Sequence, residues 1–259
     1  MKLKIQQIDA FTKEPFRGNP AAVCPLDDWL DDSLLQAIAA EMNLSETAFF
    51  VKRDDHYELR WFTPVVEVDL CGHATLASAH AIFADSETPA RRVEFSTKSG
   101  RLSVMREEDL LVMDFPSQPA KPCQAPEDLS KGLGAATEEV LCSEDFMAVL
   151  ASEEDVRRLE PDLVRFNRLP LRGVIVTSPG NDVDFVSRFF APKYGIPEDP
   201  VTGSAHCALA PYWAERLGKE RMRALQVSQR GGEIFCQVRG ERVLISGSAV
   251  KVMEAELFF

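Results

Sequence analysis

Hydrophobic and polar residues alternate along residues 3–11, the pattern that predicts a first β-strand. Residues 31–42 follow a different pattern, with acidic residues at the start and apolar residues at helical spacing. This spacing predicts an amphipathic helix that ends near Asn43. Other short runs of apolar and β-branched residues predict strands at 20–24, 45–51 and 57–63.

Two segments far apart in the chain share one pattern: a glycine, a polar residue and then a run of Ala, Leu and other small residues. The first is Cys71–His80 and the second is Thr202–Ala210. Each predicts a tight turn leading into a helix slim enough to be buried, the first over about 72–84. The unpaired N–H groups at a helix start can hold a carboxylate. The pair therefore predicts a duplicated domain with one ligand site between the halves.

The rest of the chain repeats one order of elements around these two helices. Residues 116–126 contain four prolines and are expected to be an extended linker between the halves. The remaining expected elements are helices at 127–135 and 152–159 and strands at 92–97, 101–106, 110–115, 146–150, 172–178, 183–190, 223–229, 233–239 and 242–252. A small-residue helix flanked by many antiparallel strands is best buried by a sheet wrapped around it. The pattern predicts an α+β fold.

Composition and charge narrow the classes of function. The chain has 259 residues, of which 45% are hydrophobic and 27% charged, as in ordinary globular proteins. A net charge of −12 without clustered Lys and Arg argues against nucleic acid as a partner. The start of the chain has no export signal, and no apolar run approaches the roughly 20 residues that span a bilayer. We therefore expect a cytoplasmic protein without a membrane segment.

Cysteine and histidine spacing gives no sign of a metal or of disulfides. The six cysteines contain no CxxC pair, and the four histidines lack zinc-type pairing with carboxylates or thiols along the sequence. We expect no disulfide framework and no structural metal.

Three polar side chains near the first glycine-led helix are candidates for chemistry, and each has a structural alternative. Glu46 precedes the apolar run 47–51, so it is either a solvated loop residue or a partly desolvated acid/base. His73 follows Gly72 at the helix start, where its ring either faces a ligand or caps the helix. Cys71 is either an activated thiolate or a small buried hydrophobic residue.

The densest polar run, Glu198–His206, lies before the second glycine-led helix. It contains two carboxylates, a proline, two hydroxyls and a glycine. Asp199 or Thr202 could simply cap the helix. The matching motif at residues 71–80 favours a functional role for this run.

Taken together, several motifs resemble those of the phenazine-biosynthesis isomerase (PhzF-like) family. They occur in the family's order from residue 9 to beyond residue 230. The motifs are Asn19-Pro20-Ala21-Ala22-Val23, Leu44-Ser45-Glu46-Thr47-Ala48-Phe49, Phe62-Thr63-Pro64, Glu67-Val68-Asp69-Leu70-Cys71-Gly72-His73-Ala74-Thr75, Met113-Asp114-Phe115-Pro116 and Glu198-Asp199-Pro200-Val201-Thr202-Gly203-Ser204-Ala205.

The resemblance implies a diaminopimelate-epimerase-like fold of two similar lobes, each an antiparallel sheet or barrel wrapped around a central helix. The expected lobes are residues 1–116 and 117–249, with 250–259 as a candidate addition to the first and an active-site cleft between them. The resemblance also implies a homodimeric isomerase that needs no cofactor and no metal.

By motif position, the resemblance assigns roles to individual residues. Glu46 matches the general acid/base, while His73 and Asp199 match residues that orient the substrate and tune that acid. An acid that both gives and takes a proton at neutral pH is expected to have a pKa above that of free Glu. The expected seat for a substrate carboxylate consists of Gly72, Ala74, Gly203 and Ser204.

The leading prediction is an isomerase acting on a small, carboxylate-bearing, cyclic or unsaturated metabolite. Two alternatives remain open from the sequence. Epimerases of this fold use two cysteines, of which only the first position is matched, by Cys71; the second holds Asp199-Pro200-Val201. The other alternative is a non-catalytic metabolite-binding or interaction protein.

Overall fold

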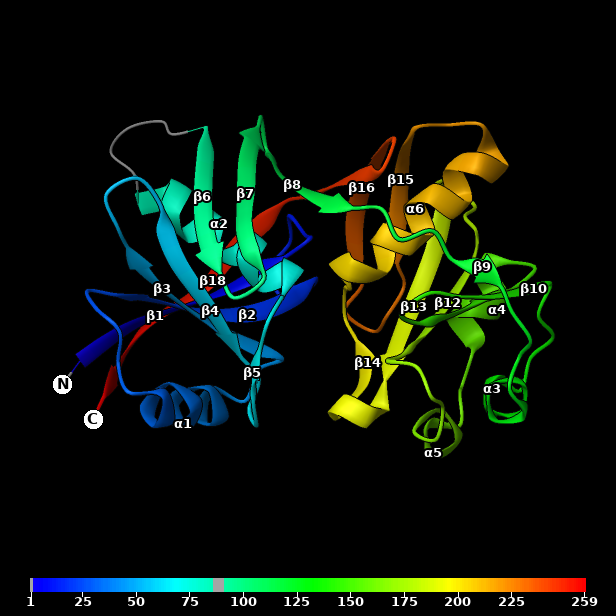
Figure 1. Ribbon diagram of the computed structural model, residues 1–259, viewed down its shortest axis with the longest axis horizontal. Coiled ribbons are helices and arrows are strands. Elements are labelled where there is room, and N and C mark those ends of the chain that lie inside the picture. The colour runs from blue at the N-terminus through cyan, green and yellow to red at the C-terminus, as the bar shows by residue number, and fades with distance from the viewer. Residues whose placement is uncertain (1, 86–90) are drawn as a thin grey trace. The chain divides into compact units, whose positions relative to one another are not determined.

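The computed structural model describes residues 2–85 and 91–259, which form two compact units (Figure 1). Unit 1 comprises the chain up to Asp114 together with Ser246–Phe259, and unit 2 comprises Phe115–Ile245. Met1 and residues 86–90 of the expected N-terminal lobe lie outside the described residues.

Unit 1 is built on one mixed sheet. Its strands are β1 (Lys2–Ala10), β2 (Asn19–Leu26), β3 (Glu46–Lys52), β4 (Tyr57–Phe62), β5 (Glu67–Val68), β6 (Arg92–Thr97), β7 (Gly100–Glu107), β8 (Leu110–Pro116) and β18 (Ala249–Phe258). The pairing order is β18–β1–β2–β3–β4–β6–β7–β8, and β5 adds a short pairing to β4. The β2–β3 and β4–β6 pairs are parallel, whereas the others are antiparallel.

Two helices of unit 1 lie in different environments. Helix α2 (Gly72–Asp85) packs against β1, β2, β3 and β18, and ten of its residues are buried. Alanines and other small side chains make this close approach possible, since each brings the helix backbone near the strands. Helix α1 (Asp32–Met42) packs one apolar face on β3 and β4 and ends at Asn43, whose left-handed φ of 50° stops the helix.

Unit 2 is likewise built of parallel and antiparallel strand pairs. Its strands are β9 (Lys121–Pro122), β10 (Glu139–Cys142), β11 (Phe146–Val149), β12 (Val174–Pro179), β13 (Phe185–Ala191), β14 (Ile196–Asp199), β15 (Arg221–Gln226), β16 (Gly232–Arg239) and β17 (Arg242–Gly247). The β11–β12 and β13–β15 pairs are parallel. Parallel pairs need longer connections, which here contain helices.

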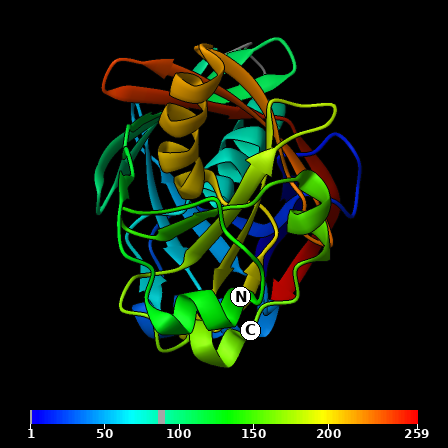
Figure 2. The same cartoon turned by 90° about the vertical axis from the view of Figure 1, so that its right-hand side faces the viewer.

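Helix α6 (Gly203–Leu217) packs against β15 and β16, and Figure 2 shows it running alongside strands of unit 2. The Trp213 ring stacks on Phe185 of β13 with ring centroids 5.8 Å apart. Its indole N–H donates to the Thr177 hydroxyl at 3.0 Å, which satisfies the buried donor. These contacts fix the orientation of the helix.

Three short helices form a second apolar layer of unit 2: α3 (Glu127–Leu133), α4 (Glu153–Arg158) and α5 (Leu163–Phe166). Helices α3 and α5 lie against each other, and α4 packs on β12 and β13. Their core cluster includes Phe166 and Phe190, whose rings are 5.9 Å apart. A 3₁₀ turn, η1 (Pro192–Tyr194), connects β13 to β14.

The structure differs from the sequence expectations in several short elements. Strands β5, β9, β10 and β14 and helix α5 were not predicted, because segments of two to four residues show no periodicity. The proline-rich segment expected as a linker contributes β9 to the sheet of unit 2. The single strand expected at 242–252 is two strands, β17 and β18. None of the helices among the described residues is long and apolar enough to cross a membrane.

The buried His206 makes unit 2 sensitive to acid. Its Nδ1 donates to the Thr202 carbonyl at 2.8 Å, the ring is fully buried, and burial lowers its pKa to about 4. The unfolded chain therefore binds more protons than the folded chain below about pH 6.5, so stability falls as pH falls through this range.

We expect the free energy of unfolding to decrease by about 1 kcal/mol per pH unit from this histidine between pH 6 and pH 4.5. Urea unfolding of His206→Gln should show a shallower pH dependence than the parent chain, with His56→Gln as the matched surface control. An unchanged slope in His206→Gln would contradict the assignment.

Candidate functional site

Glu46 is the first residue of β3, and its position follows from the elements on either side. Helix α1 ends at Asn43, and the chain then enters β3, which pairs in parallel with β2 so that Glu46 lies opposite Ala21. Its side chain is only 12% exposed. Glu46 is therefore a largely buried carboxylate at the start of a strand, and not the solvated loop residue of the alternative interpretation.

His73, the second residue of α2, lies next to this carboxylate. Its Nε2 atom is 3.2 Å from Glu46 Oε2, and its side chain is 7% exposed. The other ring nitrogen, Nδ1, is 3.2 Å from Asn19 Nδ2 and 3.5 Å from Cys71 Sγ. Three side chains, those of Asn19, Glu46 and Cys71, thus meet around one imidazole.

Burial keeps the His73 ring uncharged. Desolvation lowers its pKa to about 3, because an imidazolium ion removed from water loses its hydration. At neutral pH the ring has one N–H donor and one nitrogen acceptor. His73 can therefore hold or orient a carboxylate, but it does not carry a positive charge to it.

The start of α2 is held by its own side chains. The Thr75 hydroxyl donates to the Cys71 carbonyl at 2.6 Å, and the Thr75 N–H donates to the same carbonyl at 3.1 Å. Ala74 is buried in the helix, while Gly72 is partly exposed at its first position. This anchoring fixes the backbone from which His73 projects.

Asn19 is a site residue for which sequence reasoning assigned no role. It is fully buried at the start of β2, directly after Gly18. Gly18 has a φ of +66°, and a Cβ added there would lie 2.1 Å from the Ala10 carbonyl oxygen. Only glycine fits this turn, so the Gly-Asn-Pro sequence was the available signal for a specially placed side chain.

The same cluster has the donor types of a metal site. Glu46, Cys71 and His73 each offer one ligand atom, and these atoms lie within 4.8 Å of one another. The histidine spacing along the sequence does not reveal this grouping, because Glu46 is far from Cys71 and His73 in the chain. However, Glu46 contacts Nε2 whereas Cys71 contacts Nδ1. One metal ion uses one ring nitrogen, so the arrangement of this cluster does not match a preformed ion site.

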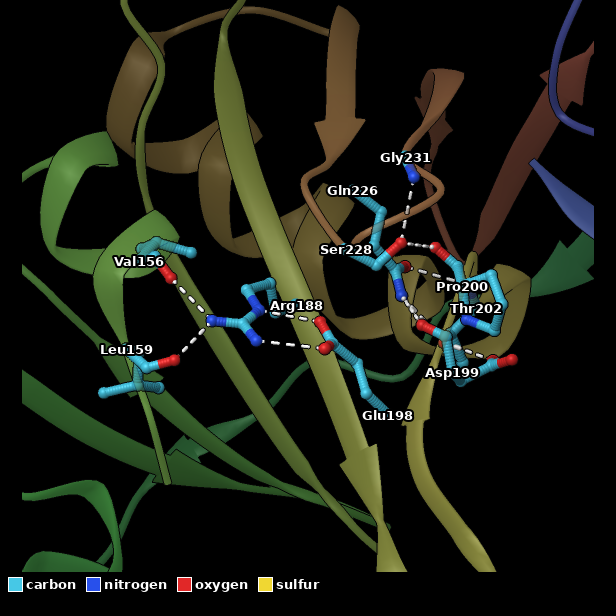
Figure 3. Close-up of polar contacts among 10 residues, drawn as sticks. All are labelled: Val156, Leu159, Arg188, Glu198, Asp199, Pro200, Thr202, Gln226, Ser228 and Gly231. Carbon is cyan, nitrogen blue, oxygen red and sulfur yellow. Dashed lines mark hydrogen bonds and ion pairs between the residues drawn. The ribbon is translucent and has the colours of Figure 1, made fainter. Parts of the chain in front are cut away.

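In unit 2, Asp199 lies in a buried network before α6 (Figure 3). The Thr202 hydroxyl donates to Asp199 Oδ2 at 2.5 Å. The Gln226 amide nitrogen donates to the Asp199 carbonyl, and the Gln226 oxygen accepts from the Thr202 N–H, both at 2.8 Å. Thr202 makes no side-chain cap of its helix, so the capping alternative does not apply to it.

The neighbouring carboxylate, Glu198, has a different environment. Arg188 donates to both of its oxygens, at 2.7 and 3.0 Å, and to the carbonyls of Val156 and Leu159 (Figure 3). This bidentate pair ties β13 to β14 and the end of α4. Of the two acidic residues in the run, Glu198 therefore has a structural role in unit 2.

Ser204, the second residue of α6, contacts a charged pair that the sequence did not predict. Arg172 donates to both oxygens of Asp145, at 2.9 and 2.5 Å, and to the Ser204 hydroxyl at 3.2 Å. Asp145 is 3% exposed. The pair places a guanidinium beside the start of α6, next to the predicted anion seat at Gly203 and Ser204.

The predicted site residues thus fall into two groups, each described within its own unit. Glu46 contacts His73 in unit 1, where Gly72 and Ala74 flank the histidine on α2; Asp199 lies just before α6 in unit 2, and Gly203 and Ser204 begin that helix. Their roles, and the expectation that one substrate cleft serves both groups, stay predictions.

Comparison with known proteins finds one family over nearly the whole chain. The family model described as "Phenazine biosynthesis-like protein" matches residues 8–255. An uncharacterized isomerase of Pseudomonas aeruginosa is 56% identical over 257 residues, which covers 99% of each chain. A crystal structure of an Enterococcus faecalis phenazine biosynthesis protein, PhzF family, has a TM-score of 0.98 and 44% identity over the full length of both chains.

A more distant similarity shows the fold alone. A hydroxyproline epimerase of Agrobacterium vitis, solved with trans-4-hydroxy-L-proline, has a TM-score of 0.63 at 12% identity and covers 99% of this chain and 92% of its own. These neighbours confirm the α+β, diaminopimelate-epimerase-like fold expected from the sequence.

The Arg172–Asp145 pair makes a testable contribution to unit 2. Arg172→Met should lower the free energy of unfolding by about 2 kcal/mol or more, because it leaves the Asp145 carboxylate buried without its charged partner. Arg172→Lys, which keeps the charge, should cost less. Urea unfolding of Arg172→Met, Asp145→Asn and the double variant measures the coupling, and strictly additive losses would contradict a direct pair.

Proposed function

The chain belongs to the phenazine biosynthesis-like protein family, several of whose members are named isomerases, and from this we propose that it is a cofactor-independent isomerase with Glu46 as its general acid/base. The observation that carries the proposal is the 3.2 Å contact between Glu46 Oε2 and Nε2 of a buried, neutral His73.

In the proposed reaction, the Glu46 carboxylate removes a proton from one carbon of a small unsaturated or cyclic carboxylic acid. The electron pair of that C–H bond forms a new C=C bond, the π electrons of the former double bond move to another carbon, and Glu46 delivers the proton to that carbon. No net proton, electron or group is gained or lost, so the step balances without a co-reactant. The His73 ring, in contact with one oxygen of the Glu46 carboxylate, would limit the direction from which Glu46 reaches the substrate.

We further propose that the N–H groups at each glycine-led helix start can bind a carboxylate, with Gly72 and Ala74 at the start of α2 in unit 1 and Gly203 and Ser204 at the start of α6 in unit 2. Arg172, beside Ser204, is paired with Asp145, so the carboxylate site at α6 depends on its N–H groups. Oriented N–H groups stabilise charge that develops on the substrate without reorganising during reaction. Asp199 would orient the substrate, as the family resemblance implies.

A two-thiol epimerase is less well supported. Cys207, the cysteine nearest the start of α6, lies within the helix and is 3% exposed. Burial raises its pKa to about 12, so the thiol remains protonated at neutral pH. Inversion by two bases needs a reactive group on each face of the substrate carbon, and this chain supplies no activated second thiol there.

Glu46→Gln should abolish proton exchange. The glutamine keeps the shape of the side chain but cannot accept a proton, so we expect turnover to fall by about 10²- to 10⁴-fold. The measurement is exchange of substrate C–H for deuterium, followed by ¹H NMR during incubation with a panel of cyclic and unsaturated carboxylic acids in D₂O. Glu41→Gln, an exposed position on α1, is the matched control. Full exchange by Glu46→Gln on an acid that the parent chain turns over would contradict the proposal.

Cys71→Ser should retain activity within about tenfold, because the hydroxyl preserves a small polar donor next to His73 Nδ1 and no thiolate chemistry is required. The same deuterium-exchange assay measures it, with Cys207→Ala as the second thiol variant. Loss of exchange in Cys71→Ser, with the fold intact by circular dichroism, would instead favour a cysteine-assisted epimerase.

A further inference from the structure

Asn19 is the buried partner of the His73 ring on the side away from Glu46. Its amide nitrogen, Nδ2, lies 3.2 Å from Nδ1, and the residue has no exposed surface. It reaches this position because β2 begins directly after the Gly18 turn and pairs with β1, placing Asn19 opposite Ala10. The backbone around Asn19 is therefore fixed independently of the histidine.

This contact determines which ring nitrogen carries the proton. An amide nitrogen of asparagine only donates hydrogen bonds. Nδ1 of His73 must then be the acceptor. A neutral imidazole has a single N–H, so that proton lies on Nε2, which faces Glu46 Oε2 at 3.2 Å. The ring N–H is consequently on the side of Glu46, where Nε2 and Oε2 are in contact without hydrogen-bond geometry.

We propose that Asn19 is a positioning residue that holds His73 in the Nε2–H tautomer, so that a ring N–H is available to Glu46 when this carboxylate acts as the base. The catalytic part of this inference rests on the proposed function. The tautomer itself does not, because it follows from the contacts of Asn19 and His73 alone.

The same tautomer bears on why sulfur is not the base. Cys71 Sγ lies 3.5 Å from Nδ1, the nitrogen whose lone pair accepts from Asn19. That single lone pair is already engaged by the Asn19 amide, and Nδ1 has no proton to offer a thiolate of Cys71. The ring therefore gives the Cys71 sulfur no hydrogen-bond donor.

The first test reads the tautomer directly and needs no substrate. In protein labelled with ¹⁵N-histidine, we expect His73 to show a pyridine-like Nδ1 resonance and a pyrrole-like Nε2 resonance at neutral pH. Comparison with His73→Gln assigns the signals among the four histidines. A pyrrole-like Nδ1 in the unmodified chain would overturn the proposal.

The second test replaces the hydrogen-bond donor beside His73 Nδ1 with an acceptor. In Asn19→Asp, the carboxylate accepts instead of donating, so Nδ1 should become the protonated nitrogen and the two ¹⁵N resonances should exchange character. Because the ring then offers Glu46 no donor in its neutral form, kcat for deuterium exchange should fall by about 10²-fold or more, with KM changed much less. Asn167→Asp makes the same chemical change at an exposed position. It should alter neither the ¹⁵N resonances of His73 nor kcat for deuterium exchange.

A third variant keeps the experiment decisive if Asn19→Asp fails to fold. Asn19→Ser retains a short hydroxyl donor and should keep the Nε2–H resonance pattern with a smaller loss of kcat than Asn19→Ala. An exchanged tautomer with unchanged kcat overturns the positioning role. Full activity of Glu46→Gln overturns the proposed function instead and leaves the tautomer assignment standing.

Discussion

Burial of a neutral imidazole against a carboxylate is the constraint on which the candidate site depends. Removing His73 from water makes its charged form costly, so the ring enters the folded protein with one donor and one acceptor. Each nitrogen then needs a partner of the opposite kind. Asn19 and Glu46 lie on the two sides of the ring. Because both contact the same imidazole, a change to either residue would alter the contact that the ring makes with the other.

The backbone meets this constraint with two adjacent parallel strands and one buried helix. Asn19 and Glu46 are the first residues of β2 and β3, which pair side by side, and His73 projects from the start of the helix packed on both strands. A helix of larger residues could not approach the strands closely enough. The small side chains of α2 thus serve the geometry of the site as well as the packing of the core.

Unit 2 shows how paired charges separate structural from functional carboxylates. Arg188 donates two hydrogen bonds to the Glu198 carboxylate, and Arg172 donates two to the Asp145 carboxylate. Asp199 is instead held through a hydroxyl and through its own backbone carbonyl. Adjacent acidic residues therefore differ in what they can offer a ligand, and composition alone does not distinguish them.

The sequence by itself determined the elements with strong periodicity and the family. It predicted α2 at 72–84, where the helix is Gly72–Asp85, and the strand 92–97 as found. It also singled out Glu46 and His73, because each stands at the boundary of such an element. These features are local. The spacing of apolar residues, and the positions of glycine and small residues, affect the backbone only through residues close in the sequence.

Only the tertiary structure decided which side chains meet. Asn19 and His73 are 54 residues apart in the chain, and Arg172 and Ser204 are 32 apart, so no local pattern relates them. Parallel pairing was also missed, because it joins segments separated by a helix or a long connection. A close contact also lies at the end of β17, where a Cβ added to Gly247 would be 2.4 Å from the Phe11 ring. Long-range packing sets these features, and a one-dimensional pattern does not record it.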